Sequence, residues 1–250
     1  MLVVPGVGDI SPANVSCSLS PEHHGDIVCG MTQHINPSNV LLIFDLDGTL
    51  YRTESSFVPT IKLAYKEHDI PYPGDAVILK RVGETFPTYL EWLVTQGFPI
   101  DVGVLRSEIG QHELDSIRHA GELYPDVEAT LRDLKRQGFK LAICTNGDAH
   151  YTHAVLGRFD LRGLFDSIQT HDNPQQTKTK MIAVLLEQFR PDHAFMIGDR
   201  YHDFVAGHAN DCTVVAATYG FAADGEADEV DVRLQQFSDL PAIIARTLGA

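Results

Sequence analysis

The sequence predicts an α/β fold in which helices cover a parallel sheet, with a helical insertion after the first strand. Short apolar runs alternate with helical patterns from Val40 onward. The runs are apolar at almost every position, which is typical of parallel strands buried on both faces. Between the first and second runs, residues 53–122 show only helical periodicity, so they are expected to form a separate helical unit.

The bulk composition of the 250 residues narrows the function classes. A net charge of −15 argues against a nucleic-acid-binding surface, which needs basic residues, and against binding to anionic membranes. No apolar run is long enough to span a membrane, and no signal-peptide pattern is found at the start. The four cysteines form no CxxC pair, so a reducing, cytoplasmic location is expected.

Residues 1–38 differ from the rest of the chain. They are rich in Gly, Pro, Ser, Asn and His and show no sustained periodicity, so we expect an irregular N-terminal extension. One hypothesis is that translation begins at Met31. A peptide from residues 1–30 in the native protein, found by mass spectrometry, would rule this out.

The elements of the first half follow from their patterns. Residues 40–45 form an apolar strand. Apolar residues at helical spacing then predict four helices, over 57–68, 76–81, 89–95 and 104–119. Gly97-Phe98-Pro99 interrupts this stretch between the last two helices. No convincing strand pattern lies within 53–122, which is why this segment is interpreted as an insertion.

The second half alternates strands and helices. The predicted strands are 139–145, 166–170, 194–197 and 213–217. The predicted helices are 125–137, 149–159, 180–189, 204–209 and 238–248. Pro125 near the start and Gly138 just past the end support the bounds of the first of these helices. This alternation is typical of a parallel sheet with helices on both faces.

Polar side chains follow the predicted strands at the points where the strands end. In chain order they are Asp45, Asp47, Thr145, Asn146, Asp199 and Asp203. Lys178 and Lys180 lie just before the helix that leads to the strand 194–197. Each feature alone has an ordinary explanation as a turn or a solvated charge. Because the carboxyl ends of parallel strands share one edge of a sheet, their joint order predicts a single site.

The residue types at this edge favour phosphoryl transfer. Three carboxylates in one place can hold Mg²⁺, which prefers oxygen ligands. The metal and a lysine would neutralise a phosphate that the carboxylates otherwise repel. A threonine hydroxyl and backbone N–H groups can hold the phosphate oxygens. One carboxylate can attack phosphorus, and a second can exchange a proton with the leaving group and with water.

Three segments resemble motifs of the haloacid dehalogenase-like hydrolase superfamily. They are Asp45-Leu46-Asp47-Gly48-Thr49-Leu50, Ile143-Cys144-Thr145-Asn146 and Gly198-Asp199-Arg200-Tyr201-His202-Asp203. The resemblance, which covers about residues 40–250, implies a Rossmann-like parallel sheet core with an inserted α-helical cap. It implies a core made of residues 39–52 and 123–250 and a cap of residues 53–122.

The resemblance also implies roles for single residues. Asp45 is the expected nucleophile, and Asp47 the general acid and base. Asp45, the backbone carbonyl of Asp47, and Asp199 are the expected Mg²⁺ ligands, with Asp203 in support. Thr145 and Asn146 are the expected phosphate contacts.

The phosphate-binding lysine has two candidates. Lys178-Thr179-Lys180-Met181-Ile182 matches the superfamily's Lys-x-x-aliphatic-Ile pattern best if the lysine is Lys178, with Lys180 as the alternative. The Lys-Pro dipeptide of many relatives is absent here.

The predicted cap resembles that of the phosphoglycolate phosphatase and β-phosphoglucomutase branch. A helical cap implies a small-molecule phosphate ester as the partner. Arg81, in the sequence Lys80-Arg81-Val82-Gly83, and Arg52 are the candidate contacts to its leaving group.

Three functions are compatible with this sequence. The first is a Mg²⁺-dependent phosphatase that hydrolyses a small phosphorylated metabolite, a monoester such as phosphoglycolate, through an aspartyl-phosphate. The second is a sugar-phosphate mutase of the β-phosphoglucomutase type. The third is a regulatory module that binds phosphate and Mg²⁺ without turnover. The second acid, Asp47, favours phosphate esters over dehalogenation.

Overall fold

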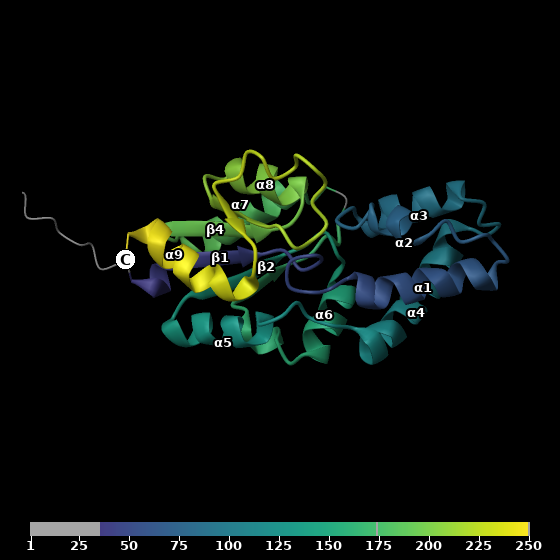
Figure 1. Ribbon diagram of the computed structural model, residues 1–250, viewed down its shortest axis with the longest axis horizontal. Coiled ribbons are helices and arrows are strands. Elements are labelled where there is room, and N and C mark those ends of the chain that lie inside the picture. Colours follow the sequence, from purple (N-terminus) through teal and green to yellow (C-terminus); the bar gives the residue numbers. More distant parts are fainter. Residues whose placement is uncertain (1–35, 174, 250) are drawn as a thin grey trace, which may run out of the picture. The chain divides into compact units, whose positions relative to one another are not determined.

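A computed structural model describes residues 36–173 and 175–249 of the chain. These residues contain a six-stranded sheet in the order β3-β2-β1-β4-β5-β6, and every pair of neighbouring strands is parallel (Figure 1). The strands are β1 (Val40–Phe44), β2 (Lys140–Cys144), β3 (Ser167–Gln169), β4 (His193–Gly198), β5 (Thr213–Ala217) and β6 (Val232–Leu234). The α/β fold expected from the alternating pattern is therefore confirmed.

Strand β1 lies at the centre of the sheet and determines where the site forms. All five of its residues are buried, as its unbroken apolar run predicts. Leu42 lies opposite Leu141 of β2 and Phe195 of β4. The backbone N–H of Asp45 donates to Ile197 O at 2.8 Å, so the pairing with β4 continues up to this residue. Asp45 is thereby fixed at the carboxyl edge of the sheet.

Helices cover both faces of the sheet (Figure 1). One face carries α5 (Val127–Gln137), α6 (Ala149–Arg158) and α9 (Leu240–Leu248), and the other carries α7 (Lys178–Phe189) and α8 (Tyr201–His208). Alternate residues of β1 point to opposite faces. Leu42 packs in the same cluster as Leu131 of α5, and Ile43 in the same cluster as Met181 of α7.

Four helices lie between β1 and α5. They are α1 (Glu54–Glu67), α2 (Asp75–Leu79), α3 (Phe86–Thr95) and α4 (Val102–Ala120), and α1 packs along α4 (Figure 1). They enclose an apolar cluster of their own, which includes Ile61, Tyr65, Leu90 and Ile109. We call α1–α4 the helical insertion. The absence of strands over the described residues 53–122 agrees with the sequence pattern.

The element bounds depart from the sequence expectations in a few places. Helix α5 begins at Val127 rather than at residue 125, because Asp126 has a left-handed backbone with φ of 62°. Helix α7 begins two residues earlier than expected, at Lys178, after the N-cap Thr177. Strand β6 was not predicted, because it follows a run of acidic residues and only Leu234 of its three residues is buried, so no apolar run marks it.

Two further sequence expectations concern the N-terminal extension and membrane-spanning helices. Most of the expected irregular extension, with Met31, lies outside the described residues; the described part contains a short 3₁₀ helix at Pro37–Asn39. Among the helices that the structure describes, none has the length and apolar character needed to cross a membrane.

Candidate active site

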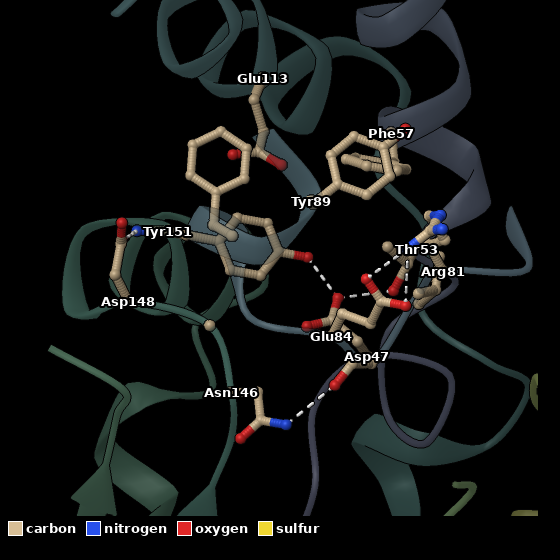
Figure 2. Close-up of a pocket in the computed structure, with 14 residues that line it drawn as sticks. Asp47, Thr53, Phe57, Arg81, Glu84, Tyr89, Glu113, Asn146, Asp148 and Tyr151 are labelled. Carbon is tan, nitrogen blue, oxygen red and sulfur yellow. Dashed lines mark hydrogen bonds and ion pairs between the residues drawn. The ribbon is translucent and has the colours of Figure 1, made fainter. Parts of the chain in front are cut away.

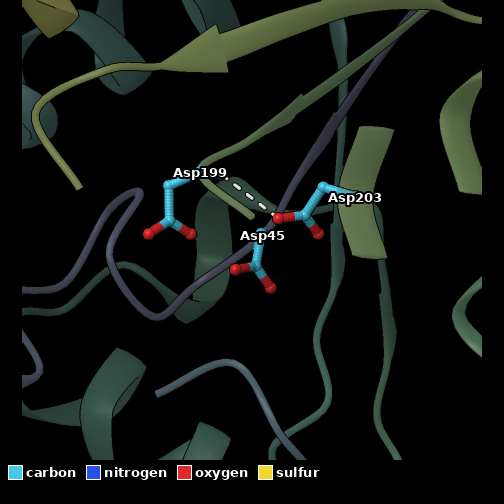
Figure 3. Close-up of side chains that lie close together, drawn as sticks. All are labelled: Asp45, Asp199 and Asp203. Carbon is cyan, nitrogen blue, oxygen red and sulfur yellow. Dashed lines mark hydrogen bonds between the residues drawn. The ribbon is translucent and has the colours of Figure 1, made fainter. Parts of the chain in front are cut away.

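Three buried aspartates meet at the carboxyl edge of the sheet (Figure 3). Asp45 follows β1, Asp199 follows β4, and Asp203 lies in the first turn of α8. One carboxylate oxygen of each lies within 4.8 Å of the others. The parallel topology therefore brings together residues that are more than 150 positions apart in the sequence, as the strand-end argument predicts.

Lys178 is the cation that faces these carboxylates. Its Nζ donates to Asp45 Oδ1 at 2.7 Å and to Asp203 Oδ1 at 2.5 Å. Burial alone would lower the pKa of Lys178, but the charges of Asp203 and Asp45 outweigh burial and raise it, so the side chain stays an ammonium ion. Lys180 is exposed and donates to Gln175 O at 3.0 Å, so of the two candidate lysines only Lys178 reaches the aspartates.

Asp203 organises the turn that follows β4. Its Oδ2 accepts hydrogen bonds from the backbone N–H of Asp199 at 3.2 Å and of Arg200 at 3.0 Å. A Cβ atom at Gly198 would lie 2.3 Å from Asp203 Cγ, so only glycine allows this close approach. Both oxygens of Asp203 are thus held by protein donors, which makes it a support for the site.

Asp199 has one oxygen with a partner and one without. Its Oδ2 accepts a hydrogen bond from the backbone N–H of Phe221 at 2.6 Å. Its Oδ1 is buried and has no hydrogen-bond partner among the described residues. A buried carboxylate oxygen without a partner is costly, so it points to a cation that binds there.

The donor set fits Mg²⁺. Burial, followed by repulsion from Asp203, raises the pKa of Asp45 to about 7, and burial with the charge of Asp45 raises that of Asp199 well above its usual range. A divalent cation bound between them would offset this repulsion. Asp45 Oδ2, which Lys178 does not hold, and Asp199 Oδ1 are the oxygens suited to such an ion.

Asp47 is held by two hydroxyl groups. Thr53 Oγ1 donates to Asp47 Oδ1 at 2.6 Å, and the Tyr151 hydroxyl donates to the same oxygen at 2.5 Å. Burial raises the pKa of Asp47, and these two hydrogen bonds oppose that rise. Burial and the charge of Asp47 raise the pKa of Tyr151 well above its usual value, so Tyr151 remains a donor.

Thr145 and Asn146 lie beside the aspartates, at the end of β2. They line a small cavity together with Asp45 and Lys178. Thr145 Oγ1 accepts a hydrogen bond from the backbone N–H of Gly147 at 3.1 Å. The Asn146 side-chain amide donates to Gly83 O at 2.8 Å, in the segment that joins α2 to α3. Asn146 therefore connects the sheet edge to the helical insertion.

A second cavity, of about 70 Å³, lies next to Asp47 on the side of the helical insertion (Figure 2). Its lining residues include Phe57, Phe86, Tyr89 and Tyr151, which are aromatic, and Arg81, Glu84 and Glu113, which are ionisable. We call it the leaving-group pocket, because it lies beside Asp47, the residue expected from the sequence to exchange a proton with a leaving group.

The two candidate arginines differ in their positions. Arg81 lines the leaving-group pocket, but its Nη1 is bonded to both carboxylate oxygens of Glu84 at 3.1 Å. Arg52 is not among the lining residues of that pocket. It pairs with Glu54 at 3.1 Å and Glu122 at 2.6 Å.

Sequence reasoning missed Tyr151 and Glu113. Tyr151 lies in the first turn of α6, six residues after Thr145, and its proximity to Asp47 is purely tertiary. Glu113 did carry a signal, because it is four residues from both Ile109 and Ile117, which are buried on α4. A carboxylate in line with a buried helical stripe is unusual and marks a possible site.

A family model of haloacid dehalogenase-like hydrolases matches residues 42–217. This is more than half of the chain and includes every residue of the aspartate cluster and Lys178. The chain belongs to this family. The six-stranded parallel sheet covered by helices is the fold of a haloacid dehalogenase-like hydrolase.

Three proteins illustrate what this haloacid dehalogenase-like hydrolase is similar to. A phosphoglycolate phosphatase of Haemophilus influenzae is 27% identical over 204 residues, covering 75% of this chain and 89% of the relative. The pyrophosphatase PpaX of Bacillus cereus is 28% identical over 222 residues, covering 82% and 95%. A crystal structure of a predicted phosphoglycolate phosphatase from Haemophilus somnus has a TM-score of 0.75 at 24% identity, covering 82% and 97%.

Proposed function

We propose that the protein is a Mg²⁺-dependent phosphatase that hydrolyses a small phosphate monoester through a phosphorylated Asp45. The observation that carries the proposal is the pairing of two aspartates with different surroundings. Asp45 contacts an ammonium group, Lys178 Nζ, at 2.7 Å, whereas Asp47 contacts two hydroxyl groups and faces the leaving-group pocket. The names of the relatives, phosphoglycolate phosphatase and pyrophosphatase, support phosphate as the transferred group.

In the first step, a carboxylate oxygen of Asp45 attacks phosphorus. A bond forms between this oxygen and phosphorus, the ester P–O bond breaks, and Asp47 gives its proton to the departing oxygen. Lys178 carries a positive charge beside the transferred group, and Thr145 and Asn146 lie where they can hold its oxygens. A bound Mg²⁺ would add positive charge next to the phosphate.

In the second step, water attacks the phosphorus of the aspartyl-phosphate. Asp47, now deprotonated, takes a proton from the water, the bond between phosphorus and the Asp45 oxygen breaks, and phosphate leaves. The same carboxyl thus acts first as an acid and then as a base. This use requires a pKa near the working pH, which agrees with the opposing effects of burial and hydrogen bonding on Asp47.

We further propose that residues 53–122 act as a cap over a core of residues 39–52 and 123–250. Two hydrogen bonds support this role. Asn146 donates to Gly83 O, and Arg200 donates to Val82 O, so the segment 82–83 is held against the sheet edge. A closed cap excludes water from the reacting groups and limits the substrate to a small molecule.

The test is phosphate release from a panel of small phosphate esters in the presence of Mg²⁺. The Asp45→Asn variant should fold normally and lose turnover, while the control Asp160→Asn, whose side chain is fully exposed, should keep it. In Asp47→Asn, mass spectrometry should detect one phosphoryl group retained on the protein, because the second step is slowed.

The outcomes separate the candidate functions. Full activity of Asp45→Asn would refute the mechanism. Isomerisation of a sugar phosphate without net phosphate release would indicate a mutase. Binding of Mg²⁺ and phosphate with no turnover of any ester would indicate a regulatory module.

A further inference from the structure

The leaving-group pocket places an unpaired carboxylate among aromatic rings. Figure 2 shows the Glu113 carboxylate pointing from α4 into the space between Tyr151 and the Phe57–Tyr89 ring pair. The rings of Phe57 and Tyr89 meet edge to face, with centroids 5.0 Å apart. Glu113 has no ion pair and no hydrogen bond with the described residues. It is the acid that the buried stripe of α4 brings to this cavity.

The charges around this pocket are predominantly negative. Asp47, Glu84 and Asp148 line it together with Glu113. Glu84 is paired with Arg81 and Asp148 with Arg106 at 3.2 Å, so Asp47 and Glu113 are the lining carboxylates without a basic partner among the described residues. The one basic residue among the lining residues, Arg81, is bonded to Glu84 and lies 4.8 Å from the centre of the Trp92 ring. Glu84 therefore already balances the charge of Arg81, which is not left free to bind an anionic ligand.

The ionisation of Glu113 agrees with this picture. Burial, followed by the charges of Asp47 and Asp148, raises the pKa of Glu113 to about 8. A carboxyl with such a pKa lacks a compensating cation. A ligand that carries a positive charge would supply this missing cation.

The geometry points to a phosphate ester of an amino alcohol as the substrate, with the ammonium group of the leaving alcohol beside Glu113 and against the surrounding aromatic rings. This inference rests on the proposed phosphatase function and names its substrate class. Aromatic faces together with a carboxylate are the usual surroundings of a bound ammonium group. The carboxylate of phosphoglycolate and the second phosphate of pyrophosphate would both meet like charges here.

Three esters that differ only in the end of the leaving group test this inference. They are 2-aminoethyl phosphate, 2-hydroxyethyl phosphate and carboxymethyl phosphate. With Mg²⁺, we expect kcat/KM to fall in that order, with a difference of about tenfold or more between the first and the last. A preference for carboxymethyl phosphate, or equal values for all three, would overturn the inference.

Variants of α4 assign the preference to Glu113. Glu113→Gln should reduce the preference for the ammonium ester to about threefold or less, and Glu113→Lys should favour the carboxylate ester. The matched control is Asp115→Asn, which removes the same charge from an exposed position of the same helix that pairs with Arg118. An unchanged preference in Glu113→Gln and Glu113→Lys would overturn the assignment.

Binding distinguishes a failure of this inference from a failure of the proposed function. Calorimetry on Asp45→Asn, in the presence of Mg²⁺, measures the affinity of each ester without turnover. Tighter binding of 2-aminoethyl phosphate together with no hydrolysis by the unmodified protein would refute the phosphatase and retain the pocket's charge preference. Hydrolysis of 2-hydroxyethyl phosphate without any advantage for the ammonium ester would retain the phosphatase and refute the preference.

Discussion

The Tyr151 hydroxyl donates to Asp47 Oδ1 at 2.5 Å, across 104 positions of sequence. Thr53, just before α1, donates to the same oxygen at 2.6 Å. The acid is therefore held from two sides, by helix α6 of the sheet core and by the start of the helical insertion. Because both donors use Oδ1, they stabilise the carboxylate form and leave Oδ2 as the oxygen that can exchange a proton with the substrate.

Replacing Tyr151 by Phe should slow turnover and shift its pH dependence. Loss of the hydroxyl removes a hydrogen bond that lowers the pKa of Asp47, so this pKa should rise further. The pH window of kcat should then move to higher pH, and kcat should fall about tenfold at neutral pH. The measurement is a kcat profile over pH for the variant and the unmodified protein.

Tyr201→Phe is the matched control for this variant. It removes the same hydroxyl from a side chain of α8 that is 56% exposed, and its profile should match that of the unmodified protein. A lower kcat in Tyr151→Phe with an unmoved pH window would mean that Tyr151 only supports the packing of α6 and does not position Asp47.

Replacing Lys178 by Met should reduce both stability and activity. The variant leaves Asp45 and Asp203 without their shared cation, and breaking a buried ion pair on one side costs about 3–5 kcal/mol. Turnover should fall about 100-fold or more, because the phosphate loses its lysine contact. Urea denaturation and phosphate release measure the two effects.

Lys180→Met provides the comparison. Lys180 is exposed and contacts the backbone oxygen of Gln175, so its loss should change the free energy of unfolding by less than about 0.5 kcal/mol. Normal activity of Lys178→Met together with an inactive Lys180→Met would show that the lysine of this site is Lys180.

The parts of the site that could be predicted from the sequence depend on one rule. The carboxyl ends of parallel strands share an edge, so Asp45, Thr145 and Asp199 could be placed together without knowing any distance. The choice between Lys178 and Lys180 depended on where α7 begins. A periodic pattern locates the start of a helix only to within a few residues.

The leaving-group pocket shows where sequence reasoning stops. The helical pattern of α4 predicts an apolar stripe but not what that stripe faces, so Glu113 could not be assigned to a pocket beside Asp47. Tyr151 is an unremarkable helix residue in sequence, and its role follows from how α6 packs against the turn after β1. The position of Glu113 thus depends on how the helical insertion is placed relative to the sheet core, whereas the contact between Tyr151 and Asp47 depends on packing within the core.

Without metal, the stability of the protein should depend on pH through Asp45. The pKa of Asp45 is raised from 3.8 to about 7, so the folded protein binds this proton more tightly than the unfolded chain. The stabilisation is complete below about pH 4 and is lost as pH rises through about 7, an effect on the order of a few kcal/mol. Melting temperatures in chelator should therefore fall over this range, and less so in Asp45→Asn.

Added Mg²⁺ should reverse this loss at high pH. The cation binds the deprotonated carboxylates, so protons compete with it at low pH. The melting temperature should rise with Mg²⁺ more at about pH 8 than at about pH 5, and Asp199→Asn should lose most of the response. An equal Mg²⁺ response at both pH values, or an unaltered response in Asp199→Asn, would contradict the assignment of these oxygens to the metal.

Replacing Gly48 by Ala should weaken metal binding in addition to lowering the stability of the fold. Gly48 has φ of +74°, and a Cβ atom there would lie 2.1 Å from Asp199 Oδ2. Gly97 also has a positive φ, +101°, but no atom within 4 Å of its Cβ position, so Gly97→Ala introduces backbone strain without a clash. The strain alone should cost each variant about 1–2 kcal/mol.

Gly48→Ala and Gly97→Ala should therefore differ in the Mg²⁺ concentration that they need for activity. Asp199 is held by the backbone N–H of Phe221 and cannot move away from Gly48 without losing that bond at 2.6 Å. Gly48→Ala should displace it and raise the Mg²⁺ concentration needed for half-maximal activity by about tenfold or more, whereas Gly97→Ala should leave this concentration unchanged. The same Mg²⁺ requirement in both variants would show that Asp199 does not hold the cation in the position proposed here.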